Sequence, residues 1–207
     1  MSALSFENID RLYWLGRYSE RVFTSLKSFS EKFDAMISYG SHESRAEFAR
    51  QICFDKSDQS SIYSGLLKAY DNAIVLRDEI GSETFSYVQL ALYEMNRAEK
   101  AAAPLLHLQK VIDNIAAFWG MADDIIEDER VRGIIKLGKR IERIDLFTRM
   151  GAPENDIRRE VRRMSYRIAK VGVRYEPEKL SEIISMANDS VINRPEFINK
   201  LEALIEI

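Results

Sequence analysis

Cysteine and histidine are scarce in this chain, and their scarcity excludes several kinds of site. Cys53 is the single cysteine, so neither an internal disulfide nor a cysteine metal cluster is available. The two histidines, His42 and His107, both lack a glutamate three residues earlier, which excludes the Glu-x-x-His pairs of a di-iron bundle. The glycine-rich phosphate loop and the serine nucleophile elbow are missing too. We therefore expect no resident cofactor.

An excess of one charge and long apolar runs are also missing. Thirty basic and 33 acidic residues leave a net charge of −3, which is too balanced for general affinity for nucleic acids or membranes. Residues 1–8 carry neither the basic nor the apolar region of a secretory signal, and the apolar runs are far too short to span a bilayer. The expectation is a cytoplasmic protein with no membrane contact and no nucleic-acid partner.

Proline and glycine are few and scattered. Four prolines and nine glycines occur in 207 residues, and none of them gather into a linker. Between them, apolar residues recur at helical spacing, and no segment has the pattern of a strand. The sequence therefore predicts an all-α fold: a single domain over residues 1–207, formed by a bundle of roughly seven helices with an internal motif repeat.

Capping patterns place the helices of the first half. The first helix is predicted from Phe6 to about Ile37, with apolar residues on several of its faces. A capping box at residues 44–47 is expected to open a short helix that contains Cys53. A longer helix should run from about Ile62 to Ile80, with Ile74 on its inward side.

Glycines and prolines set the later boundaries. Gly81 is expected to end one helix and Ser82 to cap the next. Pro104 either kinks that helix or begins a new one. Helical character is then predicted through residues 123–132 and into the second motif, ending near Gly151. Three further prolines should open the C-terminal helices of residues 153–207, and the first of these helices carries one apolar stripe. The stripe consists of Ile157, Val161, Met164, Ile168 and Val171.

A seven-residue segment occurs twice, within residues 12–24 and 134–148. The copies are Leu15-Gly16-Arg17-Tyr18-Ser19-Glu20-Arg21 and Leu137-Gly138-Lys139-Arg140-Ile141-Glu142-Arg143. A glycine inside a helix costs about 1 kcal/mol relative to alanine, so matched glycines predict two helices that approach closely there. If the helices cross antiparallel, Glu20 would pair with Arg143 and Glu142 with Arg21.

The charged residues of the repeat admit two interpretations: a packing and ion-pair device, or a ligand-binding site. The residues concerned are Arg17, Glu20, Arg21, Lys139, Glu142, Arg143 and Asp145. Asp145 occupies the register that Phe23 has in the first copy, so it is expected to point inward. A buried carboxylate needs a partner, and Arg21 or Arg143 is expected to supply it.

Both copies lie in segments that resemble the alpha-E family, bacterial all-helical proteins named for their Glu-Arg motif. Leu12–Arg21 is similar to the opening of the family, and Ile135–Asp145 to its second motif, Glu-Arg-x-Asp; residues 81–85 and 118–120 are also family-like. The resemblance implies no particular activity. Family members are often encoded beside ATP-grasp ligase-like and transglutaminase-like proteins, which implies a partner of that kind and a role in peptide ligation or modification.

The acidic run at residues 123–129 is a candidate metal site. On a continuous helix Asp123 and Glu127 would lie one turn apart, and together with Asp124 they would offer Mg²⁺ the oxygen ligands it prefers. The pattern resembles the Asp-Asp-x-x-Asp/Glu motif of all-helical terpenoid synthases, which bind diphosphates. The alternative is a solvated helix face, compensated by Arg130 and Arg132.

The helix that starts at Pro153 carries the sharpest charge feature. Its basic stripe consists of Arg159, Arg163, Arg167, Lys170 and Arg174. The stripe is either a solvated face whose side-chain stems cover apolar surface, or a docking face for an acidic partner or a phosphate-rich ligand.

Two functions stay open from the sequence. The first is an accessory protein that binds a ligase-like or protease-like partner, with self-association as a further form of binding. The second is a small enzyme or ligand-binding bundle that uses the inward charges of the repeat, with Mg²⁺ and a diphosphate or nucleotide.

Overall fold

The computed structural model describes residues 4–37 and 47–206. Within these residues the regular elements are helical, and the β structure is a single antiparallel bridge between Tyr175 and Ile205. The predicted all-α fold is confirmed. None of the described helices is both long and apolar enough to cross a membrane. The chain divides into two compact units: Met1–Arg17 with Asp128–Ile207 forms unit 1, and Tyr18–Glu127 forms unit 2.

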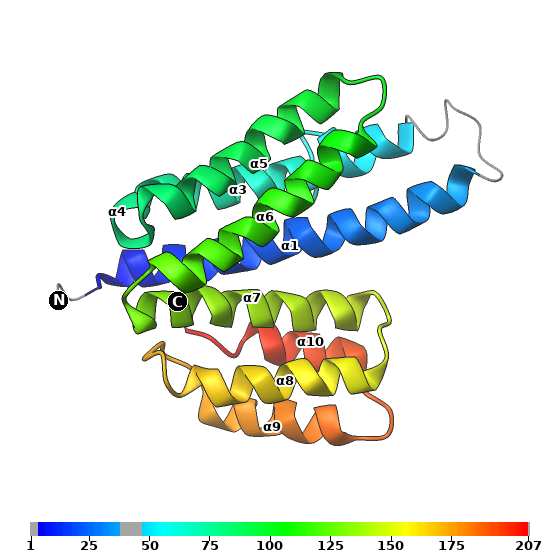
Figure 1. Cartoon of the computed structure of the whole chain (residues 1–207). Coiled ribbons are helices and arrows are strands. Elements are labelled where there is room, and N and C mark those ends of the chain that lie inside the picture. The colour runs from blue at the N-terminus through cyan, green and yellow to red at the C-terminus, as the bar shows by residue number, and fades with distance from the viewer. Residues whose placement is uncertain (1–3, 38–46, 207) are drawn as a thin grey trace. The chain divides into compact units, whose positions relative to one another are not determined.

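Unit 2 is built mainly from helices that follow the first one. Its elements are the later part of α1 (Phe6–Ile37), the π-helix η1 (Arg50–Phe54), α3 (Ile62–Val75), α4 (Arg77–Ile80), α5 (Ser82–Lys100) and α6 (Leu105–Ile125) (Figure 1). Their shared core is apolar and rich in aromatic rings: Phe29 is fully buried in it, and Phe23 meets Trp119 edge-on at 4.7 Å. Burial of this surface accounts for the association of the helices.

Unit 1 combines the start of α1 with the C-terminal helices. These are α7 (Glu129–Arg149), α8 (Glu154–Ile168), α9 (Pro177–Asn188) and α10 (Arg194–Glu202). From α7 to α10 the helices alternate in direction, as short connections require (Figure 1). The apolar stripe predicted for α8 is confirmed, because all five of its residues from Ile157 to Val171 are buried.

Most helix boundaries lie where glycines and prolines predicted them. The first helix spans Phe6–Ile37 as expected. Of the two alternatives for Pro104, the structure shows the second, since it is the N-cap of the new helix α6. Gly81 and Gly151 follow helix ends with φ of +80° and +76°, a backbone conformation that glycine adopts without a steric penalty.

Three local predictions were wrong. Ser82 is the first residue of α5 rather than its cap; its hydroxyl accepts a hydrogen bond from Arg77 Nε at 3.1 Å. Ile74 is 47% exposed, because the helix it belongs to presents its other side to the core. The predicted helix of residues 62–80 is broken at Leu76, which is one reason why the described residues contain ten helical elements where roughly seven were predicted. Ser44, of the predicted capping box, lies outside the described residues.

Candidate functional site

The repeated glycines mark a direct backbone contact within unit 1. A Cβ atom added to Gly16 would lie 2.1 Å from the carbonyl oxygen of Ile135, and one added to Gly138 would lie 2.1 Å from that of Tyr13. Real Cβ atoms are not found so close to a carbonyl oxygen, so only glycine fits at either position. The predicted close approach of the two motif helices is confirmed.

The two helices run in the same direction at this contact, so the antiparallel crossing was wrong. Phe6 and Arg130, from the first turns of α1 and α7, line one cavity. The backbone contacts of Gly16 and Gly138 lie roughly two to three turns further along each helix. In Figure 1 the start of α1 and α7 run in the same direction. The pairings of Glu20 with Arg143 and of Glu142 with Arg21 stay predictions, since matched glycines permit a close contact in either direction.

Glu142 is paired with Arg17. Arg17 Nε donates to Glu142 Oε2 at 2.6 Å, and the two residues are 8% and 0% exposed. The guanidinium carbon also lies 5.0 Å from the ring centre of Trp14. Burial disfavours the charged guanidinium, but Tyr13 and the Glu142 carboxylate outweigh it, so the pKa of Arg17 is raised above its ordinary value. The contact is a charged pair inside unit 1.

Asp145 points inward, as its register predicted, and is 5% exposed. Arg149 Nε donates to it at 2.8 Å, so its partner is a residue one turn along α7 instead of Arg21 or Arg143. Burial raises the pKa of the Asp145 carboxyl, and the bond from Arg149 opposes that rise.

The remaining motif residues occupy varied surroundings. Glu20 is fully buried and accepts a hydrogen bond from Thr24 Oγ1 at 2.9 Å. The Arg21 guanidinium lies over the ring of Tyr18, with 5.6 Å between its carbon and the ring centre. Lys139 and Arg143 are partly buried on α7. Some charged side chains of the repeat are therefore buried and others are half-buried.

The acidic run does not have the geometry that the magnesium hypothesis assumed. Asp123 and Asp124 are in the last turn of α6, which ends at Ile125, and Glu127 lies beyond it. Asp128 is the N-cap of α7, and its carboxylate accepts from the backbone N–H groups of Arg130 and Val131. Among the described residues, no three His, Cys, Asp or Glu side chains lie together as a metal site would require.

A second buried carboxylate organises the basic helix α8. Glu160 is 1% exposed and is bonded by Arg140 Nη1 from α7 and, at 2.9 Å, by Arg163 Nη1. Arg159 Nε is 3.8 Å from the same carboxylate. Buried carboxylates require compensating charge, and here the compensation draws arginines from two helices to one place.

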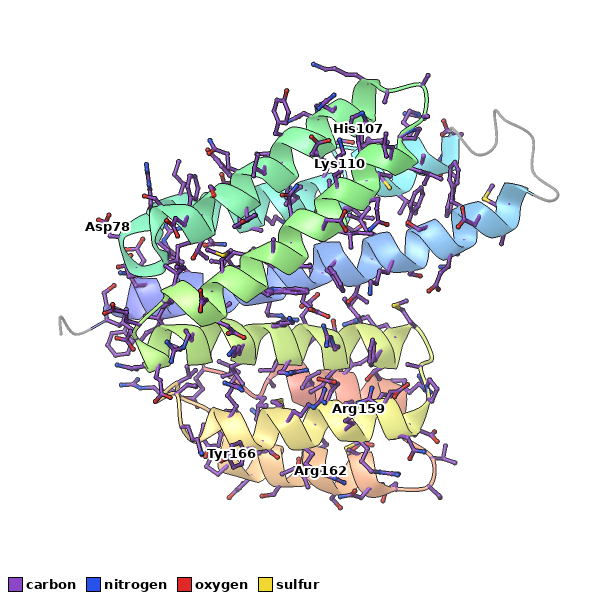
Figure 2. The ribbon with its side chains drawn as sticks, in the orientation of Figure 1. Asp78, His107, Lys110, Arg159, Arg162 and Tyr166 are labelled. Carbon is purple, nitrogen blue, oxygen red and sulfur yellow. The ribbon has the colours of Figure 1, made fainter. Side chains whose placement is uncertain are left out.

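Beside Glu160 the arginines form a groove of about 530 Å³. Its lining residues are Arg140, Arg162, Arg163, Tyr166 and Arg167. This set, which we call the arginine groove, contains four guanidinium groups and no carboxylate. Arg162 and Tyr166 follow one another along α8 in Figure 2. The groove is therefore strongly electropositive and suited to an anion.

The predicted stripe does not form one surface. Arg163 and Arg167 line the groove, whereas Arg159 pairs with Asp156 at 2.9 Å. Lys170 Nζ donates to the Tyr166 hydroxyl at 2.7 Å, and Arg174 lies over the ring of Phe6 in another part of unit 1. Two residues of the groove were not predicted from the sequence: Arg162, which is one residue off the stripe, and Arg140, which comes from α7. The sequence signal for this site is the register of Glu160, which places a carboxylate on the apolar side of α8, three residues after Ile157 and four before Met164. A carboxylate on that side requires arginines nearby.

The fold and these sites define an all-helical protein whose helices meet at matched glycines, each followed four residues later by a buried Glu and then an Arg. The chain belongs to the Alpha-E family, described as a predicted alpha-helical domain with a conserved ER motif, whose model matches residues 7–170. Glu20-Arg21 and Glu142-Arg143 are the Glu-Arg pairs of the repeated segment. No curated protein and no solved structure matches it.

Proposed function

We propose that this chain is an accessory, partner-binding protein that uses the arginine groove to dock an acidic segment of another protein. The observation that carries the proposal is the lining of the groove, which brings four arginines together without a carboxylate. The chain as a whole has a net charge of −3, so this positive region is a local feature and not a consequence of composition.

Accessibility supports the same use. The side chain of Arg163 is 51% exposed although one of its nitrogens is bonded to buried Glu160. An arginine that is anchored at one nitrogen loses less conformational entropy when it binds a partner than a free one does. Glu160 therefore prepares the groove for binding.

The kind of partner is proposed from the family resemblance, which implies an ATP-grasp ligase-like or transglutaminase-like protein. We propose that a protein of this kind supplies the acidic segment. In that case this protein takes part in a system of peptide ligation or modification without carrying the chemistry itself.

The test is capture of partners from the native host by the tagged full-length chain at low salt, with identification by mass spectrometry. Arg162→Glu should lose a stoichiometric ligase-like or protease-like partner. Lys32→Glu, an equal charge change at an exposed site in α1, should retain it. Equal capture by both variants, or recovery of the wild-type chain alone, would contradict the proposal.

A second candidate function, a small enzyme or ligand-binding bundle, is favoured by one observation. The raised pKa of Asp145, on the same helix as buried Glu142, is the kind of perturbation that active sites share with structural ion pairs. This candidate predicts that a nucleotide or diphosphate with Mg²⁺ raises the melting temperature. It also predicts that Glu142→Gln removes this response while the fold survives.

A further inference from the structure

We propose that the arginine groove is a phosphate-binding site, and that the acidic segment it docks carries a phosphorylated side chain. The inference rests on the proposed function and specifies its ligand: a phosphate monoester presented by a protein partner. It follows from the charge of the groove, the donors that Glu160 leaves available, and the size of the groove.

The charge of the groove exceeds what a single carboxylate ligand would balance. Two of its guanidinium groups, those of Arg140 and Arg163, share the one carboxylate of Glu160. Arg162 forms no ion pair with any residue in the described part of the chain. A phosphate monoester, with a charge of roughly −1.5 to −2 at pH 7, compensates this excess better than the side chain of Asp or Glu does.

The donors in the groove suit a tetrahedral oxyanion. Glu160 is bonded by one nitrogen of Arg140 and one of Arg163, while each guanidinium has five N–H groups. The remaining donors come from two helices, α7 and α8, and so approach a ligand from different directions. Phosphate has three terminal oxygens against the two of a carboxylate, so it accepts from more guanidinium groups at once.

Tyr166 adds a polar group to the same lining. Its hydroxyl accepts from Lys170 Nζ, which leaves the phenolic O–H able to donate toward the groove and places a further positive charge beside it. The volume of about 530 Å³ is within the range of small-ligand sites and accommodates a phosphoryl group with the side chain that carries it.

The first experiment measures binding of phenyl phosphate and phenyl sulfate to the full chain by isothermal titration at pH 7.5 and constant ionic strength. The two probes share the ring and differ mainly in charge. We expect phenyl phosphate to bind at least tenfold more tightly, and Arg162→Gln to weaken it by about tenfold, as loss of a charge-assisted bond does. Arg77→Gln, at an exposed arginine of α4 in unit 2, is the matched control and should bind as the wild type does.

Equal affinity for the two probes, or equal loss in Arg162→Gln and Arg77→Gln, would overturn the phosphate site. The proposed function would survive that result if capture of an acidic partner still required Arg162. The source of the phosphate is tested by treating the host extract with a phosphatase before capture. Loss of the partner is expected. Capture that is unaffected by the phosphatase would overturn the phosphorylated partner, and tight binding of phenyl phosphate alone would then assign the groove to a small phosphorylated ligand.

Discussion

Two buried glutamates on adjacent helices, Glu142 in α7 and Glu160 in α8, form ion pairs with arginine in different surroundings. Glu142 is 0% exposed and its partner Arg17 is 8% exposed, so both members lie inside unit 1. Glu160 is 1% exposed, but the side chain of its partner Arg163 is 51% exposed. The Glu142 carboxylate joins α7 to α1 near the glycine contact. The Glu160 carboxylate holds arginines at the surface of the arginine groove.

The difference determines what each pair contributes. When both charges are removed from water, loss of one leaves the other buried without compensation, which is strongly destabilising. Glu160 keeps Arg140 when exposed Arg163 is lost, so that loss costs little stability and mainly changes what the surface can bind. We therefore assign the Arg17–Glu142 pair to the fold and the arginine groove to recognition.

The largest effect is expected from Glu142→Gln, which keeps the shape of the side chain but removes the counter-charge of Arg17. The free energy of unfolding should fall by about 3 kcal/mol or more, in the range measured for broken buried pairs. Urea unfolding followed by circular dichroism measures it. A variant that keeps wild-type stability would contradict the structural assignment and favour a ligand site at the repeat.

The next effect concerns the contact that brings this pair together. Gly16→Ala places a methyl group against the Ile135 carbonyl and should cost about 1–3 kcal/mol, the usual range for overpacking. Gly120→Ala is the control, because a Cβ at Gly120 in α6 meets nothing within 4 Å. Helix propensity alone should make the control more stable by about 0.5–1 kcal/mol. If both changes act alike in thermal unfolding, the helices do not depend on close contact at Gly16.

A smaller, pH-dependent effect is expected at Glu94 in unit 2, a third paired carboxylate. Its hydrogen bond to His107 Nδ1, at 2.6 Å, lowers the pKa of Glu94 from its ordinary 4.5. Stabilisation of this kind is fully present above pH 4.5 and is lost as the pH falls through the lowered pKa. Glu94→Gln should therefore be less stable than wild type by about 1 kcal/mol at pH 6 to 7. The difference in stability between the variant and the wild type should vanish in strong acid. A difference that grows below pH 4 would contradict the stabilising role of the Glu94–His107 pair.

The sequence predicted those features that depend on one helix or on a matched pair of residues. Prolines and glycines located most helix ends, and the repeat predicted the contact of Gly16 with α7. The register of Asp145 predicted its inward direction. Each of these follows from local backbone preference or helical periodicity, which the chain carries in a single segment.

The features that it did not predict depend on how different helices meet. Matched glycines do not encode the direction of a crossing, so Arg17 as the partner of Glu142 could not be deduced. Arg140 lines the groove from α7, and its position in the sequence does not indicate that it contacts α8. The break between α6 and α7 had a local signal, because Asp128 is a favoured N-cap residue.

The most direct test of the division between fold and recognition is a comparison of Arg17→Gln with Arg162→Gln in urea unfolding at pH 7. The two variants make the same chemical change in the same unit. We expect Arg17→Gln to lose about 3 kcal/mol or more, because it removes a charged hydrogen bond of fully buried Glu142. Arg162→Gln should stay within about 0.5 kcal/mol of wild type, as exposed substitutions do. Equal losses in the two variants, or a larger loss in Arg162→Gln, would contradict the account.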